Sequence, residues 1–65
     1  MGYNEIIKTL NDLNGKNVFI RLYDCVLIGR LDVQERYDEY HDQYFYVGTK
    51  QTRVWPSDII DLREV

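Results

Sequence analysis

The spacing of the apolar residues changes once along this chain, at Lys16. Before Lys16 the apolar side chains recur at intervals of three and four residues, at Tyr3, Ile6, Ile7, Leu10 and Leu13. This interval places them on one face of a helix and predicts a helix over about residues 3–14. Asn4 is expected to cap its first turn, and Asn14-Gly15 to end it. A helix of roughly ten residues is only marginally stable alone, so its apolar face is expected to pack on the rest of the chain.

From Lys16 onward, apolar residues alternate with other residues, which is typical of half-buried strands. The alternation predicts five strands, at about residues 16–23, 26–33, 43–47, 51–55 and 59–62. A tight turn at Asp24-Cys25 joins the first two strands. Pro56 starts a single helical turn before the last strand, because proline cannot donate to a strand ladder. Residues 34–42 are polar, acidic and rich in tyrosine, and they are expected to form either a loop or the extended end of a hairpin.

The second predicted strand has apolar residues on both of its faces. Leu27, Leu31 and Val33 share one face, while Val26 and Ile28 fall on the other. Such a strand is either buried on both sides or sharply bent. Gly29 favours the bend, because a glycine inside a strand often marks a bulge or a barrel corner.

These elements leave few architectures for 65 residues. A chain of this length forms one domain, residues 1–65, and buries only about 60% of the surface that its unfolded form exposes. An open antiparallel sheet of this size would leave unpaired edges, which closure into a barrel removes. The expected fold class is therefore mainly β: a small, bent, five-stranded antiparallel barrel with an N-terminal α-helix across one end.

Two runs carry a family resemblance: Leu10-x-x-Leu13-x-Gly15-Lys16-x-Val18-x-Ile20-x-Leu22-x-Asp24 with Ile28-Gly29-x-Leu31, and Trp55-Pro56-Ser57-Asp58-Ile59-Ile60-Asp61-Leu62. The first resembles the start of Sm-like proteins, and the second is similar to the end of SH3 domains. The resemblance implies an SH3-like or Sm-like small barrel and no functional residue. The Asp and Asn with which Sm proteins contact RNA bases have no counterpart, nor has their Arg-Gly motif. The SH3 peptide site needs a tyrosine after Pro-Ser, where this chain has Ile59, and a tryptophan in the middle of the chain.

The residues that could support catalysis are few: Ser57, Cys25 and His41 are the single serine, cysteine and histidine. A nucleophile needs a neighbouring base and a group that orients it, and no spacing connects these three. We therefore expect no enzymatic activity. The acids and histidine of residues 38–42 lack the ligand spacing of a metal site, so no metal or cofactor is expected. One unpaired thiol suits a reducing cytoplasm, and no apolar run is long enough to suggest a membrane partner.

The most distinctive segment is acidic and rich in tyrosine. Residues 32–42 hold five acids and one base, a net charge of −4, whereas the whole chain carries −3. Tyrosines are enriched at interface hot spots, and acids can steer a basic partner. The predicted partner-binding residues are Tyr37, Asp38, Glu39, Tyr40, Tyr44 and Tyr46. Alternatively, these rings cover the open end of a core that is too small to close itself.

The basic residues form a second candidate set: Lys16, Arg21, Arg30, Lys50 and Arg53. If they gathered on one face with Phe19 or Tyr23, they could bind a single-stranded nucleic acid, although the net charge makes this partner less favoured. The expected function is a non-enzymatic protein-interaction module, of the kind that phages and mobile elements encode. The alternatives are an Sm-like nucleic-acid-binding regulator that forms a ring homo-oligomer, and an acidic mimic of nucleic acid that blocks a DNA-binding protein.

Overall fold

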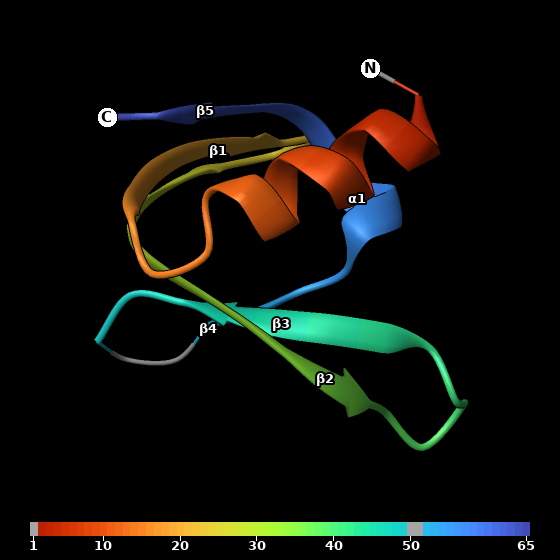
Figure 1. Cartoon of the computed structure of the whole chain (residues 1–65). Coiled ribbons are helices and arrows are strands. Elements are labelled where there is room, and N and C mark those ends of the chain that lie inside the picture. Colours follow the sequence, from red (N-terminus) through yellow and green to blue (C-terminus); the bar gives the residue numbers. More distant parts are fainter. Residues whose placement is uncertain (1, 50–51) are drawn as a thin grey trace.

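The computed structural model describes residues 2–49 and 52–65 (Figure 1). Its elements are α1 (Tyr3–Asp12), β1 (Asn17–Leu22), β2 (Val26–Tyr37), β3 (Gln43–Val47), β4 (Thr52–Val54), the 3₁₀ turn η1 (Pro56–Asp58) and β5 (Ile59–Glu64). The strands form one antiparallel sheet in the order β4-β3-β2-β1-β5. The expectation of a mainly β chain with five antiparallel strands and an N-terminal helix is confirmed.

Strand β2 connects the two layers of the sheet, because it pairs with a strand in each of them. Its first half pairs with β1 and its second half with β3. In Figure 1 it runs from the layer of β1 and β5 to the layer of β3 and β4. Among the described residues no pairing joins β4 to β5, so these strands are the two edges of a strongly bent, open sheet.

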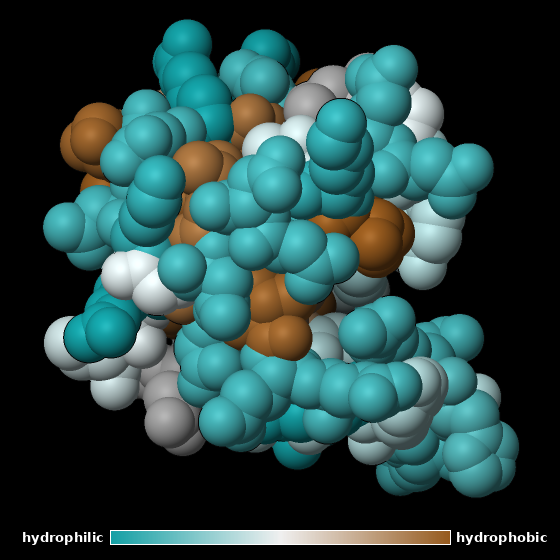
Figure 2. All heavy atoms as spheres, viewed as in Figure 1, coloured by the Kyte–Doolittle hydropathy of each residue, from teal (hydrophilic) through white to brown (hydrophobic). Residues whose placement is uncertain are grey.

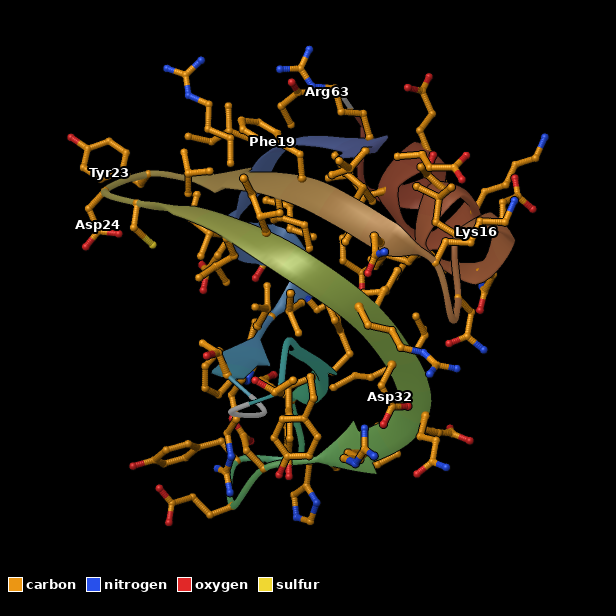
Figure 3. The ribbon with its side chains drawn as sticks, turned by 90° about the vertical axis from the view of Figure 1, so that its left-hand side faces the viewer. Lys16, Phe19, Tyr23, Asp24, Asp32 and Arg63 are labelled. Carbon is orange, nitrogen blue, oxygen red and sulfur yellow. The ribbon has the colours of Figure 1, made fainter. Side chains whose placement is uncertain are left out.

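A close contact between two glycines accompanies the bend in β2, whose curvature is visible in Figure 3. A Cβ atom added to Gly29 would lie 2.8 Å from the Cα atom of Gly48, at the end of β3. The Gly48 N–H donates to the Arg30 carbonyl oxygen at 3.0 Å. Val26 and Ile28 are exposed, so β2 is bent rather than buried on both faces.

The core lies between the two layers and the helix. Its buried members are Ile6, Leu10, Val18, Ile20, Leu31, Phe45, Val47, Val54, Ile59 and Leu62. The alternation in β1 predicts an inward face of Val18, Ile20 and Leu22; the first two are fully buried, and Leu22 is half-buried. Helix α1 packs against β5, η1 and β2. Figure 2 shows apolar atoms reaching the surface between the helix and the layer of β3, where Ile7 and Val33 help to line a pocket of about 220 Å³.

Helix α1 starts at Tyr3 as predicted, but its cap and its last residue differ from the prediction. The residue before α1 is Gly2, in an extended conformation and without a side-chain cap, so the prediction that Asn4 caps the helix is wrong. Asn4 lies inside the first turn, where the backbone is already helical. At the other end, Gly15 adopts a φ of +83° and donates its N–H to the Leu31 carbonyl oxygen. Asn14 accepts a hydrogen bond from the Val33 N–H, so the helix end is tied to β2.

Strand β2 is longer than predicted, because residues 34–37 continue it. After an irregularity that follows Asp32, Arg36 pairs with Tyr44 and Tyr37 with Gln43. Of the two alternatives for this segment, the extended hairpin is therefore the one observed. The turn at Asp24-Cys25 and the helical turn at Pro56 are confirmed. Lys50 and Gln51, in the predicted turn and fourth strand, lie outside the described residues.

Candidate functional site

The end of the β2–β3 hairpin and the residues after β4 enclose a pocket of about 500 Å³. It is lined by Tyr37, Asp38, Glu39, Tyr40, Tyr44, Arg53 and Trp55, and we call it the aromatic pocket. Five of the six predicted partner-binding residues are among these, and Tyr46 lies beside the pocket in contact with Tyr44. The tyrosine-rich segment thus forms one concave surface.

The base of the aromatic pocket is a packed group of rings. Tyr44 on β3 is only 8% exposed. Its ring centroid lies 5.8 Å from that of Trp55, and 5.6 Å from that of Tyr46 in an edge-to-face arrangement. Strand pairing explains the contact between Tyr44 and Trp55. Phe45 pairs with Val54, so the neighbouring Tyr44 and Trp55 lie opposite each other and point away from the core. These rings hold the base of the pocket in place.

Asp38 connects the hairpin turn to this base. One of its carboxylate oxygens, Oδ2, accepts the Trp55 Nε1–H at 3.0 Å. The other, Oδ1, accepts the backbone N–H groups of Tyr40 at 2.8 Å and Asp42 at 3.0 Å. The hydrogen bond from the Asp42 N–H, helped by those from Tyr40 and Trp55, lowers the pKa of Asp38. Asp38 is therefore a carboxylate that orients Trp55 as well as a charge in the pocket wall.

The rim of the aromatic pocket is open to solvent. Tyr37 is 54% exposed and Tyr40 is 76% exposed, and Glu39 between them is also exposed. The Tyr37 hydroxyl hydrogen-bonds the Glu35 carboxylate, which raises the pKa of Tyr37. A partner that enters the pocket would therefore meet two tyrosine rings and the exposed Glu39 carboxylate first.

Two arginines already pack on the tyrosine rings. The Arg53 guanidinium carbon lies 4.7 Å from the ring centroid of Tyr44, and that of Arg36 lies 4.4 Å from the centroid of Tyr46. Arg36 also forms an ion pair with Asp32 at 3.1 Å. These contacts show that the faces of these rings accept guanidinium groups.

The structure adds members that the sequence analysis did not assign to this site. Trp55, Arg53 and Arg36 all contact its rings, although Arg53 was assigned to the nucleic-acid set and the other two to no site. For Trp55 the sequence contains a signal, since it is the single tryptophan of the chain and tryptophan is enriched at interface hot spots.

The basic residues of the alternative site divide among several surfaces. Arg21 and Arg30 are exposed and occupy the outer face of β1 and β2, next to the buried Ile20 and Leu31. Arg53 packs in the aromatic pocket. Lys16 lies in the connection between α1 and β1, and Lys50 is outside the described residues.

The residues considered for catalysis lie in three different connections. Cys25 is exposed in the turn between β1 and β2, His41 lies in the hairpin turn, and Ser57 lies in η1. In the described part of the chain, no three His, Cys, Asp or Glu side chains are grouped as a metal site would require. Nor does any described helix have the length and apolar character needed to cross a membrane. What the aromatic pocket combines is ring faces and carboxylates, which suit the binding of a cation.

No protein-family model matches the chain, and the curated proteins contain no match to its sequence.

Proposed function

We propose that this protein is a non-enzymatic interaction module that binds a basic segment of a protein partner in the aromatic pocket. The observation that supports this proposal is the lining of the pocket. Two exposed tyrosines, a tryptophan and two acids converge on one concavity of about 500 Å³. Few other side chains combine with such a lining as well as arginine and lysine, which can stack on the rings and pair with the carboxylates.

The charge distribution supports the same partner. The segment of residues 32–42 carries a net charge of −4, and it forms the hairpin around the pocket. Asp38 and Glu39 place two of these charges in the lining, where the single positive charge of Arg53 offsets one of them. A basic segment would be attracted over several ångströms before contact, and the rings would then supply the contact area. Arg53 on Tyr44 is an intramolecular example of the same interaction.

We further infer that the bent sheet is a small barrel of the SH3-like or Sm-like type, in a cytoplasmic protein. The order β4-β3-β2-β1-β5, the bend at Gly29 and the 3₁₀ turn before β5 support the barrel. The single, exposed Cys25 supports a reducing compartment.

Trp55 provides a direct test, because it is the single tryptophan and lines the pocket. Its fluorescence would be followed while a short arginine-containing peptide is added, and in parallel a peptide of the same sequence with glutamine in place of arginine. We expect a saturable change with the arginine peptide that weakens as salt is raised, and little change with the glutamine peptide. Equal responses to the two peptides, or none to either, would refute the proposal.

Two tyrosine variants form a matched pair for this test. Tyr40→Ala removes an exposed ring from the rim, whereas Tyr23→Ala removes a 93% exposed ring from the turn between β1 and β2. We expect Tyr40→Ala to weaken peptide binding and Tyr23→Ala to leave it unchanged. The same loss in both variants would mean that the peptide binds elsewhere.

A further inference from the structure

A second surface lies on the outer side of β1, β2 and β5. Ile20, Leu31 and Leu62 are buried, so the residues that alternate with them point outward. The outward residues are Phe19, Arg21, Val26, Ile28, Arg30, Asp61 and Arg63, and we call this surface the arginine face. In Figure 3, Phe19 and Arg63 project from the outside of β1 and β5, away from the body of the molecule.

The arginine face is a strip of apolar groups with arginines beside it. Phe19 pairs with both Ile28 and Arg63, and the Arg63 guanidinium carbon lies 4.6 Å from the centroid of the Phe19 ring. Val26 and Ile28 are 49% and 66% exposed. Exposed apolar side chains next to each other on a sheet face are typical of a contact surface.

The charge of this face is opposite to that of the hairpin. The arginine face contains three arginines and one acid, the half-buried Asp61, so its net charge is +2, whereas the whole chain has a net charge of −3. The hairpin segment, residues 32–42, carries −4. The two surfaces share no residue, since one lies on β1, β2 and β5 and the other at the ends of β2, β3 and β4. One molecule can therefore offer both surfaces at the same time.

We propose that the arginine face docks on the aromatic pocket of a second copy of this chain. The inference rests on the proposed function, because arginine belongs to the class of side chain that the pocket is proposed to bind. The rim tyrosines Tyr37 and Tyr40 match the exposed Val26 and Ile28 as well as the arginines of the face. A nucleic acid fits less well. The negative net charge of the protein would repel a polyanion, and phosphate groups make no favourable contact with the apolar strip.

Such a contact joins two different surfaces and is therefore heterologous. Each copy gives its arginine face to one neighbour and its aromatic pocket to another, so copies build a chain or close into a ring. Because much of the attraction is between exposed charges, association should weaken as salt is raised.

The test uses sedimentation velocity over about a hundredfold range of protein concentration, at low and high salt. The face variant carries Arg21→Glu and Arg30→Glu, and the pocket variant carries Glu39→Lys and Tyr40→Ala. All four residues are exposed, and Lys8→Glu, which reverses one charge on the exposed side of α1 away from both surfaces, is the control. Circular dichroism checks that each variant folds, and Gln replaces Glu in the face variant if it does not.

We expect the parent and Lys8→Glu to associate at low salt and each of the other variants to remain monomeric. A mixture of the face variant and the pocket variant should then form a 1:1 dimer of twice the 7.8 kDa chain mass, because one supplies an intact pocket and the other an intact face. The dimer cannot grow, because its two remaining surfaces are the altered ones. The arginine peptide should dissociate it.

Several results would overturn the inference. These are a parent protein that is monomeric at every concentration, association that survives in both variants, and a mixture that stays monomeric. Binding of a single-stranded oligonucleotide by a monomeric parent, lost in the face variant, would assign the arginine face to nucleic acid instead. If the parent is monomeric but Trp55 still responds to the arginine peptide, only this inference fails. If Trp55 does not respond, the proposed function fails.

Discussion

The contact between Gly29 and Gly48 makes a quantitative prediction about the substitution Gly29→Ala. The new Cβ atom would lie 2.8 Å from the Gly48 Cα atom and 3.1 Å from its nitrogen. Both are backbone atoms, so no side-chain rotation relieves the overlap, and β2 must move away from the end of β3. Overpacking of this kind costs about 1–3 kcal/mol of the free energy of unfolding. For a domain of this size, whose total is about 5 kcal/mol or little more, that is a large share.

Thermal unfolding followed by circular dichroism measures the effect. In a domain of 60–100 residues, 1 kcal/mol shifts Tm by roughly 4–8 °C, so Gly29→Ala should lower Tm by about 5–20 °C. Arg30→Ala is the matched control, because Arg30 is the next residue of β2 and its side chain is exposed. It should change the free energy of unfolding by no more than about 0.5 kcal/mol. If both variants melt within about 2 °C of the parent, β2 does not pass against Gly48 as described.

Three further predictions concern the core, the hairpin turn and the rim. Ile20→Ala should cost about 2–5 kcal/mol and the exposed Ile28→Ala less than about 0.5 kcal/mol in chemical denaturation, and equal costs would contradict the strand register. Asp38 has a folded-state pKa below its ordinary value of 3.8, so its stabilising effect is present at neutral pH and is lost as pH falls through the folded value. Asp38→Asn should therefore flatten the acid side of a plot of Tm against pH, and an unchanged plot would deny its role. Tyr37→Ala with Tyr40→Ala should leave Tm nearly unchanged while speeding dissociation of a bound peptide, and a Tm drop of several degrees would show that these rings cover the core.

The parts of the fold that local patterns determine could be predicted from the sequence. Val18 and Ile20 are branched residues that alternate with Asn17, Phe19 and Arg21, and a period of two places the branched pair on one face. Pro56 cannot join a ladder, so the break before the last strand follows from one residue. A glycine inside a strand often marks a bend, so the bend at Gly29 also follows from one residue.

The parts of the fold that depend on distant contacts could not be predicted from the sequence. Residues 34–37 contain no pattern of branched residues, yet they extend β2, because β3 supplies the pairing and Arg36 packs on Tyr46. The helix starts at Tyr3 as predicted, but its cap does not follow from residue type: Asn4 is a good cap by type, and type does not show where the extended backbone ends. The cost of exposed edges predicts a closed sheet, but the described pairings leave β4 and β5 as edges.

The candidate site shows the same division. Tyr37, Asp38, Glu39 and Tyr40 are neighbours in sequence, so composition alone could bring them to one place. Trp55 reaches the site only because β3 pairs with β4, and its hydrogen bond to Asp38 spans 17 positions of the chain. A single sequence carries no direct signal for a contact of that kind.

The tyrosines of the hairpin differ in their exposure. Tyr44 is almost fully buried against Trp55 and Tyr46, so its ring supports the pocket from below. Tyr37 and Tyr40 are largely exposed and contribute little to that support. In this hairpin, the packed rings of Tyr44 and Tyr46 therefore support the pocket, whereas the exposed rings of Tyr37 and Tyr40 are accessible to a partner. Because Asp38 is engaged by the turn and by Trp55, the exposed Glu39 is left as the pocket acid that can pair with an incoming cation, and it is the residue whose replacement by glutamine should slow association most.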